Sequence, residues 1–530
     1  MTQTASSTRG VVAAPHWLAA EAGRAVLAEG GNACEAMVAM LATIAVVYPH
    51  MSTIGGDAFW LVREPDGRVF HIEACGGAGS GASIAAYRKH GYDMLPARGA
   101  HAALTVAGTV GGWSRALELA RAAGGRLPLD VLLHDAITHA RNGFAVARCQ
   151  ADVSVKLPDA LREAPGFADH FLRDGAFLKE GDPLVQPALA ATLEQLAHAG
   201  LDDFYRGDVA REIAADLERI KSPVTREDLR RYEARFTRPL EAKLKSVRLW
   251  NSPPPTQGLA SLLILGIAER LDLGHPDSTA FAHGLVEATK RAFRIRDRIV
   301  TDPRQMDEKP ADFLTPEIFE REAARISANR AAPWPAMPED EGDTVWLGAI
   351  DGQGRAVSAI QSIYWEWGSG CVLPATGILW QNRGAAFSLD ERARNPLQPG
   401  RLPFHTLNPP IAVTSDGRVI SYGTMGGDGQ PQTQAAVLVR ALMGLGVGEA
   451  VAAPRWRLGR TWGETETTLK IEPRFDDSVF RALSQMGHAV ELVSKPFSTE
   501  LGQAGLIIRH PDGRIEGTHD PRADGGALGV

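Results

Sequence analysis

The sequence predicts an α+β fold in which sheets are covered by helices. Residues 110 to 300 mostly carry amphipathic helical patterns, such as GWSRALELARAAG and LAATLEQLAHAG. After residue 344 the chain changes to short strand-like runs, and two helical segments follow them. A Pro- and acid-rich linker, RAAPWPAMPEDEGD, separates these two parts. Strands and helices that are segregated along the chain favour this fold over a doubly wound sheet.

The elements before the linker are mainly helical. Two helices flank the turn Gly30-Gly31-Asn32, and two strands flank the turn Pro65-Asp66-Gly67. The most apolar run occupies 36–48, which is too short to span a bilayer and indicates a buried helix. A strand-like segment, LEAKLKSVRLWN, begins at residue 240 and interrupts the helical region.

The elements after the linker begin with a hairpin. Strands are expected over 345–350, 355–363, 371–381, 409–414 and 418–423, and helices over QTQAAVLVRALMGLG and DSVFRALSQMG. If residues 351–354 form the hairpin loop, Ile350 pairs with Arg355 and Ser362 lies opposite Asp343, diagonal to Thr344. A β-bulge would shift this register.

Composition limits the class of protein. The 530 residues are 44% hydrophobic and 22% charged, with a net charge of −7, which gives no support for a nucleic-acid partner. The four cysteines are far apart and form no CxxC pair, so we expect neither a metal cluster nor a disulfide framework. The first residues lack the pattern of a signal peptide. We therefore expect a cytoplasmic protein with no membrane segment.

Nine fragments, spread over nearly the whole length, together resemble the γ-glutamyltranspeptidase family of N-terminal nucleophile hydrolases. They occur in the family's order: GGNACEA, PHMSTIGGDAFWLV, VAGTVGGW, ARNGFAV, SPPPTQG, GDTVWLGAIDGQGRAVSAIQS, GSGCVLPATGILWQN, LNPPIAV and GTMGGDG. The resemblance implies a four-layer αββα sandwich. It also implies a precursor that cleaves itself between Asp343 and Thr344. Residues 1–343 then form a large, partly helical subunit and residues 344–530 a small one, and both build one core.

Thr344 is the nucleophile that the resemblance implies. A threonine hydroxyl is a poor nucleophile without an adjacent base, and a free α-amino group has a pKa near 8, which suits this task. Thr344 acquires that amine only when the peptide bond before it is cut. The alternative is that Thr344 is an ordinary β-branched strand residue.

Three further residues complete the expected catalytic machinery. Gly426 and Gly427 form a Gly-rich turn just before a helix, where successive backbone N–H groups suit a developing oxyanion. Ser362 matches the position of a supporting Thr hydroxyl in the family and could hydrogen-bond the nucleophile. A surface serine on a strand is the alternative.

The sequence departs from the family where the family holds the glutamyl head. Cys75 stands where an Arg binds the α-carboxylate, and Tyr364 and Ala386 stand where an Asn and an Asp hold the α-amino group. A pair of serines beside the oxyanion glycines corresponds to His405 and Thr406. Each lost charge-assisted hydrogen bond contributes roughly 1.5–3 kcal/mol, so glutamyl recognition should be weak.

The substrate class follows from these departures. The expected substrate-binding residues are His405, Thr406, Tyr364 and Arg383. Of these, His405 and Arg383 are candidate ligands for a small carboxylate, although a packed or surface role is open for each. The segment between Phe387 and Arg401, SLDERARNPLQPG, is too short for the family's lid, so water should reach an acyl-enzyme. We expect hydrolysis of a short carboxylate-bearing amide such as oxamate, without metal or organic cofactor.

Other functions and assemblies remain as alternatives. The chain could be a γ-glutamyl hydrolase or transferase that acts on glutathione-like compounds, or a cephalosporin-acylase-like enzyme. It could also be a non-catalytic paralogue that binds a metabolite. The expected partners are a small amide, water and the two subunits of the same precursor, and a homodimer of processed heterodimers is a further expectation.

Overall fold

Two seven-stranded antiparallel sheets form the centre of the molecule, which we describe from a computed structural model covering residues 3–155, 158–334, 343–459 and 467–530. Most of the predicted linker therefore lies outside the described residues. The first sheet has the order β1 (Thr4–Ser7), β22 (Ile515–His519), β21 (Ala504–Arg509), β17 (Val419–Thr424), β16 (Ile411–Thr414), β11 (Val247–Asn251) and β10 (Leu240–Lys243). The second has the order β23 (Gly526–Gly529), β2 (Gly10–Ala14), β12 (Asp343–Asp351), β13 (Ala356–Tyr364), β3 (Asp57–Arg63), β4 (Val69–Ala74) and β9 (Arg235–Thr237).

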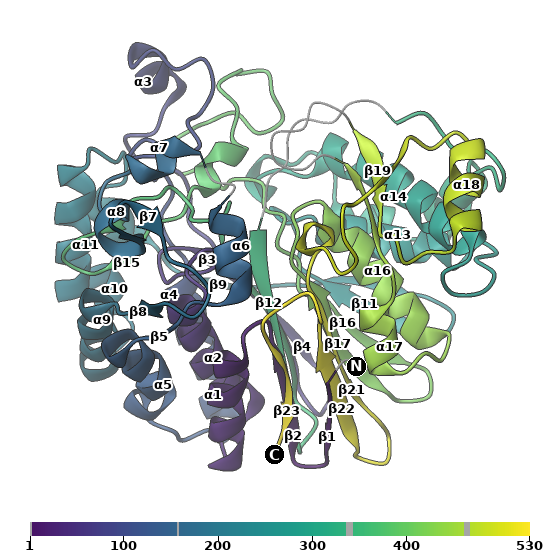
Figure 1. Ribbon diagram of the computed structural model, residues 1–530, viewed down its shortest axis with the longest axis horizontal. Coiled ribbons are helices and arrows are strands. Elements are labelled where there is room, and N and C mark those ends of the chain that lie inside the picture. The colour runs from purple at the N-terminus through teal and green to yellow at the C-terminus, as the bar shows by residue number, and fades with distance from the viewer. Residues whose placement is uncertain (1–2, 156–157, 335–342, 460–466) are drawn as a thin grey trace.

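Helices cover the outer face of each sheet (Figure 1). The helices on the side of the second sheet include α1 (Trp17–Ala28), α2 (Ala33–Val47), α4 (Thr109–Ala122), α5 (Leu129–Asn142) and α9 (Pro187–Ala199). Those on the side of the first sheet include α13 (Gly258–Ala268), α14 (Thr279–Ile299), α15 (Pro316–Ala323), α16 (Gly429–Leu442), α17 (Val447–Ala452) and α18 (Asp477–Gln485). The fold is thus the expected αββα sandwich.

Further elements, most of them short, surround this sandwich. The helices are α3 (Ile84–Lys89), α6 (Arg148–Ser154), α7 (Asp159–Arg162), α8 (Phe167–Phe171), α10 (Asp203–Arg206), α11 (Asp208–Arg219) and α12 (Arg226–Arg231), with 3₁₀ turns η1 (Pro303–Gln305), η2 (Pro310–Phe313), η3 (Arg383–Ala386) and η4 (Thr499–Leu501). The strands are β5 (Phe144–Ala145), β6 (Leu172–Arg173), β7 (Ala176–Phe177), β8 (Pro183–Leu184), β14 (Val372–Leu373), β15 (Ile378–Leu379), β18 (Trp456–Gly459), β19 (Thr468–Ile471) and β20 (Val490–Leu492).

Alternation along β12 explains why its side chains enter two different hydrophobic layers. Val345 and Leu347 pack into the core between the second sheet and its helices, whereas Trp346 and Ile350 pack into the core between the two sheets. Gly423 on β17 leaves room for the Trp346 ring, because a Cβ there would lie 2.1 Å from that ring. A helix would have the wrong period for this segregation.

The apolar run before Pro49 forms α2, and every residue of that helix is buried. Asn32 caps the helix by accepting hydrogen bonds from the backbone N–H groups of Cys34 and Glu35, and the Glu35 carboxylate accepts one from the Asn32 backbone N–H. The prediction of a buried helix is confirmed. Across the described residues, no helix is both long and apolar enough to cross a membrane.

Strands from both sides of residue 343 are interleaved in both sheets. In the second sheet, β12 and β13 lie between β2 and β3, which come from the first part of the chain. In the first sheet, β11 and β10 extend the edge that begins with β16. Each of the two sheets is therefore built from strands of both parts of the chain.

Candidate active site

Thr344 is fully buried near the start of the central strand β12. It shares the alternation of Trp346 and Ile350, so its side chain lies on the face of the second sheet that faces the first sheet. The amide Nε2 of Gln430, in the first turn of α16, donates a hydrogen bond of 3.3 Å to the Thr344 hydroxyl. This contact places the beginning of α16 next to Thr344.

The hairpin of β12 and β13 differs by one residue from the predicted register. Ile350 pairs with Ala356, not with Arg355, because Arg355 belongs to the loop, and Asp343 pairs with Tyr364, not with Ser362. A bulge between Asp343 and Val345 shifts the register at this end of the hairpin. It leaves Thr344 opposite Ser362 and Ile363. The predicted pairing was wrong. In the observed register Ser362 lies closer to the candidate nucleophile Thr344 than in the predicted diagonal arrangement.

Gly426 and Gly427 form the turn between β17 and α16. Their φ angles are +113° and +48°, both in the region that favours glycine. Among the residues that the structure describes, none accepts a hydrogen bond from either amide N–H. Two adjacent donors without a described protein acceptor, at the beginning of a helix beside Thr344, are the arrangement that an oxyanion requires.

Side chains from distant elements hold this turn in place. Gln257 donates from Nε2 to the carbonyl oxygens of Gly427, at 2.9 Å, and of Thr406, at 2.8 Å. Arg296 on α14 donates to Gln257 Oε1 at 2.7 Å and forms an ion pair with Asp428, the N-cap residue of α16. Burial lowers the Arg296 pKa, but the carboxylates of Asp428 and Asp297 outweigh it and raise that pKa. These contacts therefore fix the conformation of the turn before any substrate binds.

Asp57 is a candidate site residue that sequence reasoning missed. It pairs with Ser362 across β3 and β13, and it shares the face of Phe59, which packs between the sheets. Its Oδ1 accepts hydrogen bonds from the backbone N–H groups of Gly76, at 3.3 Å, and Gly108, at 3.0 Å. Burial raises the Asp57 pKa to about 7, and Arg383 opposes this shift. A carboxyl at the start of a buried strand, in GGDAFW, was the available signal.

His405 and Thr406 lie beside Asp57 and are fully buried. The Nε2 of His405 is 3.7 Å from Asp57 Oδ2, and its ring packs edge-on against Phe59 with centroids 4.9 Å apart. Neither ring nitrogen of His405 nor the Thr406 hydroxyl hydrogen-bonds to a described residue. Burial, together with Arg383, lowers the His405 pKa well below its usual value. The imidazole is therefore neutral and carries no charge for a carboxylate.

Arg383 supplies a positive charge at this site. Its side chain is buried, and its guanidinium lies 3.8 Å from the centroid of the Tyr364 ring. It is close enough to Asp57 and His405 to affect the pKa of both. Tyr364 has a φ of +82°, a left-handed conformation that is uncommon for a bulky residue and is found at binding sites. The structure thus brings together Arg383, Tyr364 and His405 from separate segments.

Burial also keeps Cys75 uncharged. Cys75, where the family carries an Arg, is buried, and burial raises its pKa well above the usual value. A neutral thiol cannot replace a guanidinium.

The aromatic residues Trp346 and Trp367 belong to the packed core. Among the described residues, the group with metal-ligand spacing lies on α14 and before β20, not around Thr344.

Comparison with known proteins identifies the family of this chain. A family model described as Gamma-glutamyltranspeptidase matches residues 19–530. The chain belongs to this family. It is 50% identical over 525 residues to the protein named Oxamate amidohydrolase proenzyme of Klebsiella pneumoniae, with 99% of each chain covered. It is also 38% identical over 534 residues to the Glutathione hydrolase-like YwrD proenzyme of Bacillus subtilis, with 100% of each chain covered.

Solved structures of γ-glutamyltranspeptidase relatives show the same architecture. The cephalosporin acylase from Bacillus halodurans superposes with a TM-score of 0.90 at 31% identity, covering 100% of this chain and 97% of that one. This likeness and the match over residues 19–530 confirm both the predicted family and the predicted fold.

Proposed function

We propose that this γ-glutamyltranspeptidase-family chain is a proenzyme that becomes a hydrolase by cutting itself between Asp343 and Thr344. The support is the position of Thr344, whose hydroxyl accepts a hydrogen bond from Gln430 in the first turn of α16, the helix that follows the Gly426-Gly427 turn. The relatives named as proenzymes support a precursor of this kind. The cut frees the α-amino group of Thr344, which then serves as the base for its own hydroxyl.

The reaction of the mature enzyme follows from these groups. The Thr344 hydroxyl attacks the amide carbonyl carbon while the α-amino group takes its proton, and the Gly426 and Gly427 amides bind the oxyanion. The protonated amine then gives its proton to the leaving nitrogen, and an ester to Thr344 remains. Water attacks this ester, and the same amine again removes and returns a proton. The products are a carboxylic acid and ammonia or an amine.

The substrate we propose is a short amide that carries one carboxylate, such as oxamate. Arg383 provides a positive charge in a buried setting, and His405 is neutral. Asp57, with a pKa of about 7, holds a proton below that pH and donates it in a hydrogen bond. The carboxyl faces Gln381 and His405, and a substrate oxygen in the candidate site is the acceptor that we propose. With Asp57 protonated and His405 neutral, the charge among these three side chains is the positive charge of Arg383, which suits a monoanion.

The experiment that tests this function measures ammonia release from oxamate by the matured protein. Intact-mass analysis first has to find a fragment that begins at Thr344. The comparison substrates are oxamide, which is a neutral analogue, and a γ-glutamyl anilide. We expect kcat/KM to be highest for oxamate. A tenfold preference for the γ-glutamyl compound, about 1.4 kcal/mol in transition-state binding, would instead support a glutathione-hydrolase function.

A further inference from the structure

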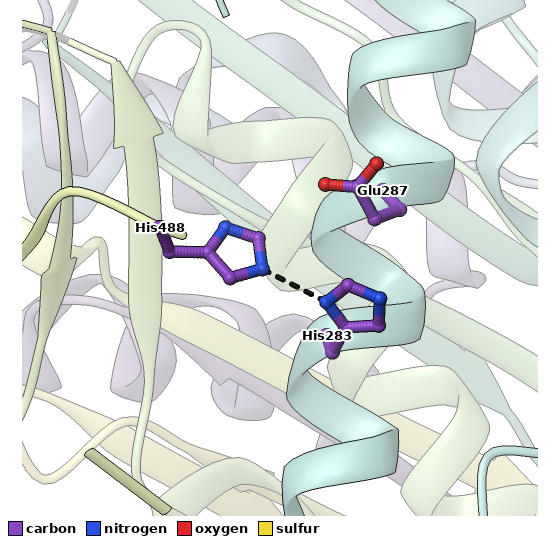
Figure 2. Close-up of side chains that lie close together, drawn as sticks. All are labelled: His283, Glu287 and His488. Atoms are coloured by element: carbon purple, nitrogen blue, oxygen red, sulfur yellow. Dashed lines mark hydrogen bonds between the residues drawn. The ribbon is translucent and has the colours of Figure 1, made fainter. Parts of the chain in front are cut away.

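A cluster of two histidines and one glutamate lies outside the machinery around Thr344. His283 and Glu287 are four residues apart on α14, so both side chains lie on one face of that helix. His488 comes from the segment between α18 and β20 and faces them, as Figure 2 shows. The three side chains are 2%, 1% and 7% exposed. Their candidate ligand atoms all lie within 4.8 Å of one another.

His283 is oriented as a metal-binding histidine usually is. His283 Nε2 is 2.7 Å from the carbonyl oxygen of Ser327. Because a carbonyl only accepts, this nitrogen carries the proton, and Nδ1 of His283 presents a lone pair. Nδ1 accepts a hydrogen bond of 2.9 Å from Nε2 of His488, whose proton has to move to Nδ1 of the same ring before this nitrogen can bind a metal. A backbone carbonyl that fixes the tautomer of a histidine is the outer shell typical of zinc-binding histidines.

Glu287 has two present partners, which leave acceptor positions open on its carboxylate. Its Oε1 accepts a hydrogen bond from Lys290 Nζ at 2.6 Å, and its Oε2 accepts one from the Ala332 amide at 3.1 Å. A carboxylate has about four acceptor positions, so it can accept these bonds and still bind a metal. Lys290 also donates to the Ala332 carbonyl oxygen at 2.8 Å, a bond that it keeps if Glu287 turns towards a metal.

We propose that His283, Glu287 and His488 bind a divalent transition metal, with Zn²⁺ the best match. Two imidazoles and one carboxylate form a common zinc ligand set, with bonds of about 2.0–2.2 Å. Tetrahedral bonds of that length place neighbouring ligand atoms ~3.3 Å apart. The two nitrogens are already near this separation, and the Glu287 carboxylate reaches it by rotating about its own side-chain bonds.

The consequence of this site is structural. His283 and Glu287 precede the linker and His488 follows it, so the metal joins the two parts of the chain. Ser327 and Ala332, which contact the cluster, lie in the segment that leads towards the linker. If the proposed cut occurs, the metal links the two subunits across it. This link between subunits depends on the proposed function, whereas the metal site itself does not.

Zn²⁺ titration of chelator-treated protein, in competition with a chromophoric chelator, tests the proposal. The Thr344→Ala chain is used alongside the wild type, so that the result does not depend on cleavage. We expect one Zn²⁺ per chain. Second-shell changes weaken zinc binding about 10–100-fold, and loss of a ligand in His488→Gln or Glu287→Gln should weaken it by ~100-fold or more. His510→Gln, which removes a partly exposed histidine paired with Glu516, is the matched control and should bind normally.

Further measurements keep the proposal falsifiable if a variant folds poorly. His488→Cys replaces an imidazole with a thiolate ligand and should retain Zn²⁺ binding. Lys290→Met removes the ammonium that hydrogen-bonds to Glu287 and competes with the metal for this carboxylate, so it should tighten Zn²⁺ binding. Co²⁺ in the wild-type protein should give the visible absorption of a four-coordinate ion, and His283→Gln should lose it. Equal Zn²⁺ affinity in the wild type and in His488→Gln, or no one-to-one binding in the wild type, would overturn the proposal.

Discussion

Raising the pH above 7 should reduce kcat/KM for oxamate much more than kcat/KM for oxamide. The reason is Asp57, whose pKa burial raises to about 7. Below that pH the carboxyl is protonated and adds no negative charge beside Arg383. Above it the ionised carboxylate cancels the charge of Arg383 and repels the carboxylate of oxamate. Oxamide carries no charge and does not experience this repulsion.

The size of the effect follows from the titration of one group. The protonated fraction of Asp57 falls about tenfold for each pH unit above its pKa. Because half of Asp57 is already ionised at pH 7, the ratio of kcat/KM for oxamate to that for oxamide should fall ~50-fold between pH 7 and pH 9, which corresponds to about 2.3 kcal/mol. The α-amino base also titrates in this range, but it acts on both substrates, so the ratio removes its contribution.

The assay measures ammonia release from both substrates at half-unit pH intervals from 6 to 9. Asp57→Asn is the decisive variant, because its amide keeps an oxygen for the Gly76 and Gly108 amides and cannot ionise. The ratio should then be independent of pH. Asp66→Asn, at an exposed turn, is the matched control and should follow the wild type. A ratio in the wild type that stays flat across pH 7 would refute the role of Asp57.

Three other predictions concern the nucleophile, the oxyanion turn and specificity. Thr344→Ala should remain a single chain without activity, and its intact mass should show no fragment that begins at position 344; cleavage of this variant would rule out the proposed nucleophile. Gly427→Val should lower kcat on the order of 10²–10³-fold, since the left-handed φ of +48° disfavours a β-branched residue. A folded variant with an unchanged rate would show that the oxyanion is bound elsewhere. Arg383→Gln should raise KM for oxamate but hardly alter that for oxamide, and equal effects on both would contradict a charge-binding role.

The sequence was sufficient for the architecture and for a candidate nucleophile. The strands after residue 344 were expected within two residues of β12, β13, β16 and β17, because each carries a clear β pattern between turn residues. The order in which strands pair was not accessible from these patterns. The sheet neighbours β12 and β2 come from opposite sides of the linker and lie far apart in the sequence, and no local pattern encodes that pairing.

The details of the candidate site were harder to predict because they depend on tertiary contacts. The loop of the first hairpin is one residue longer than predicted, so the assumed pairing placed Ser362 opposite the wrong residue, and the bulge shifts the end of the hairpin further. Gln430 and Asp57 look like ordinary polar residues in the sequence, and only the packing of α16 and β3 brings them to Thr344 and Ser362. The charge state of His405 also depends on burial, which composition does not reveal.

The burial of Thr344 gives the proposed cut a chemical purpose beyond exposing a nucleophile. An α-amino group in water has a pKa of about 8 and is mostly protonated at pH 7. At a fully buried position, desolvation disfavours the charged form and lowers that pKa. Burial of a chain end that is generated inside the sandwich therefore favours the neutral amine that the reaction needs as a base.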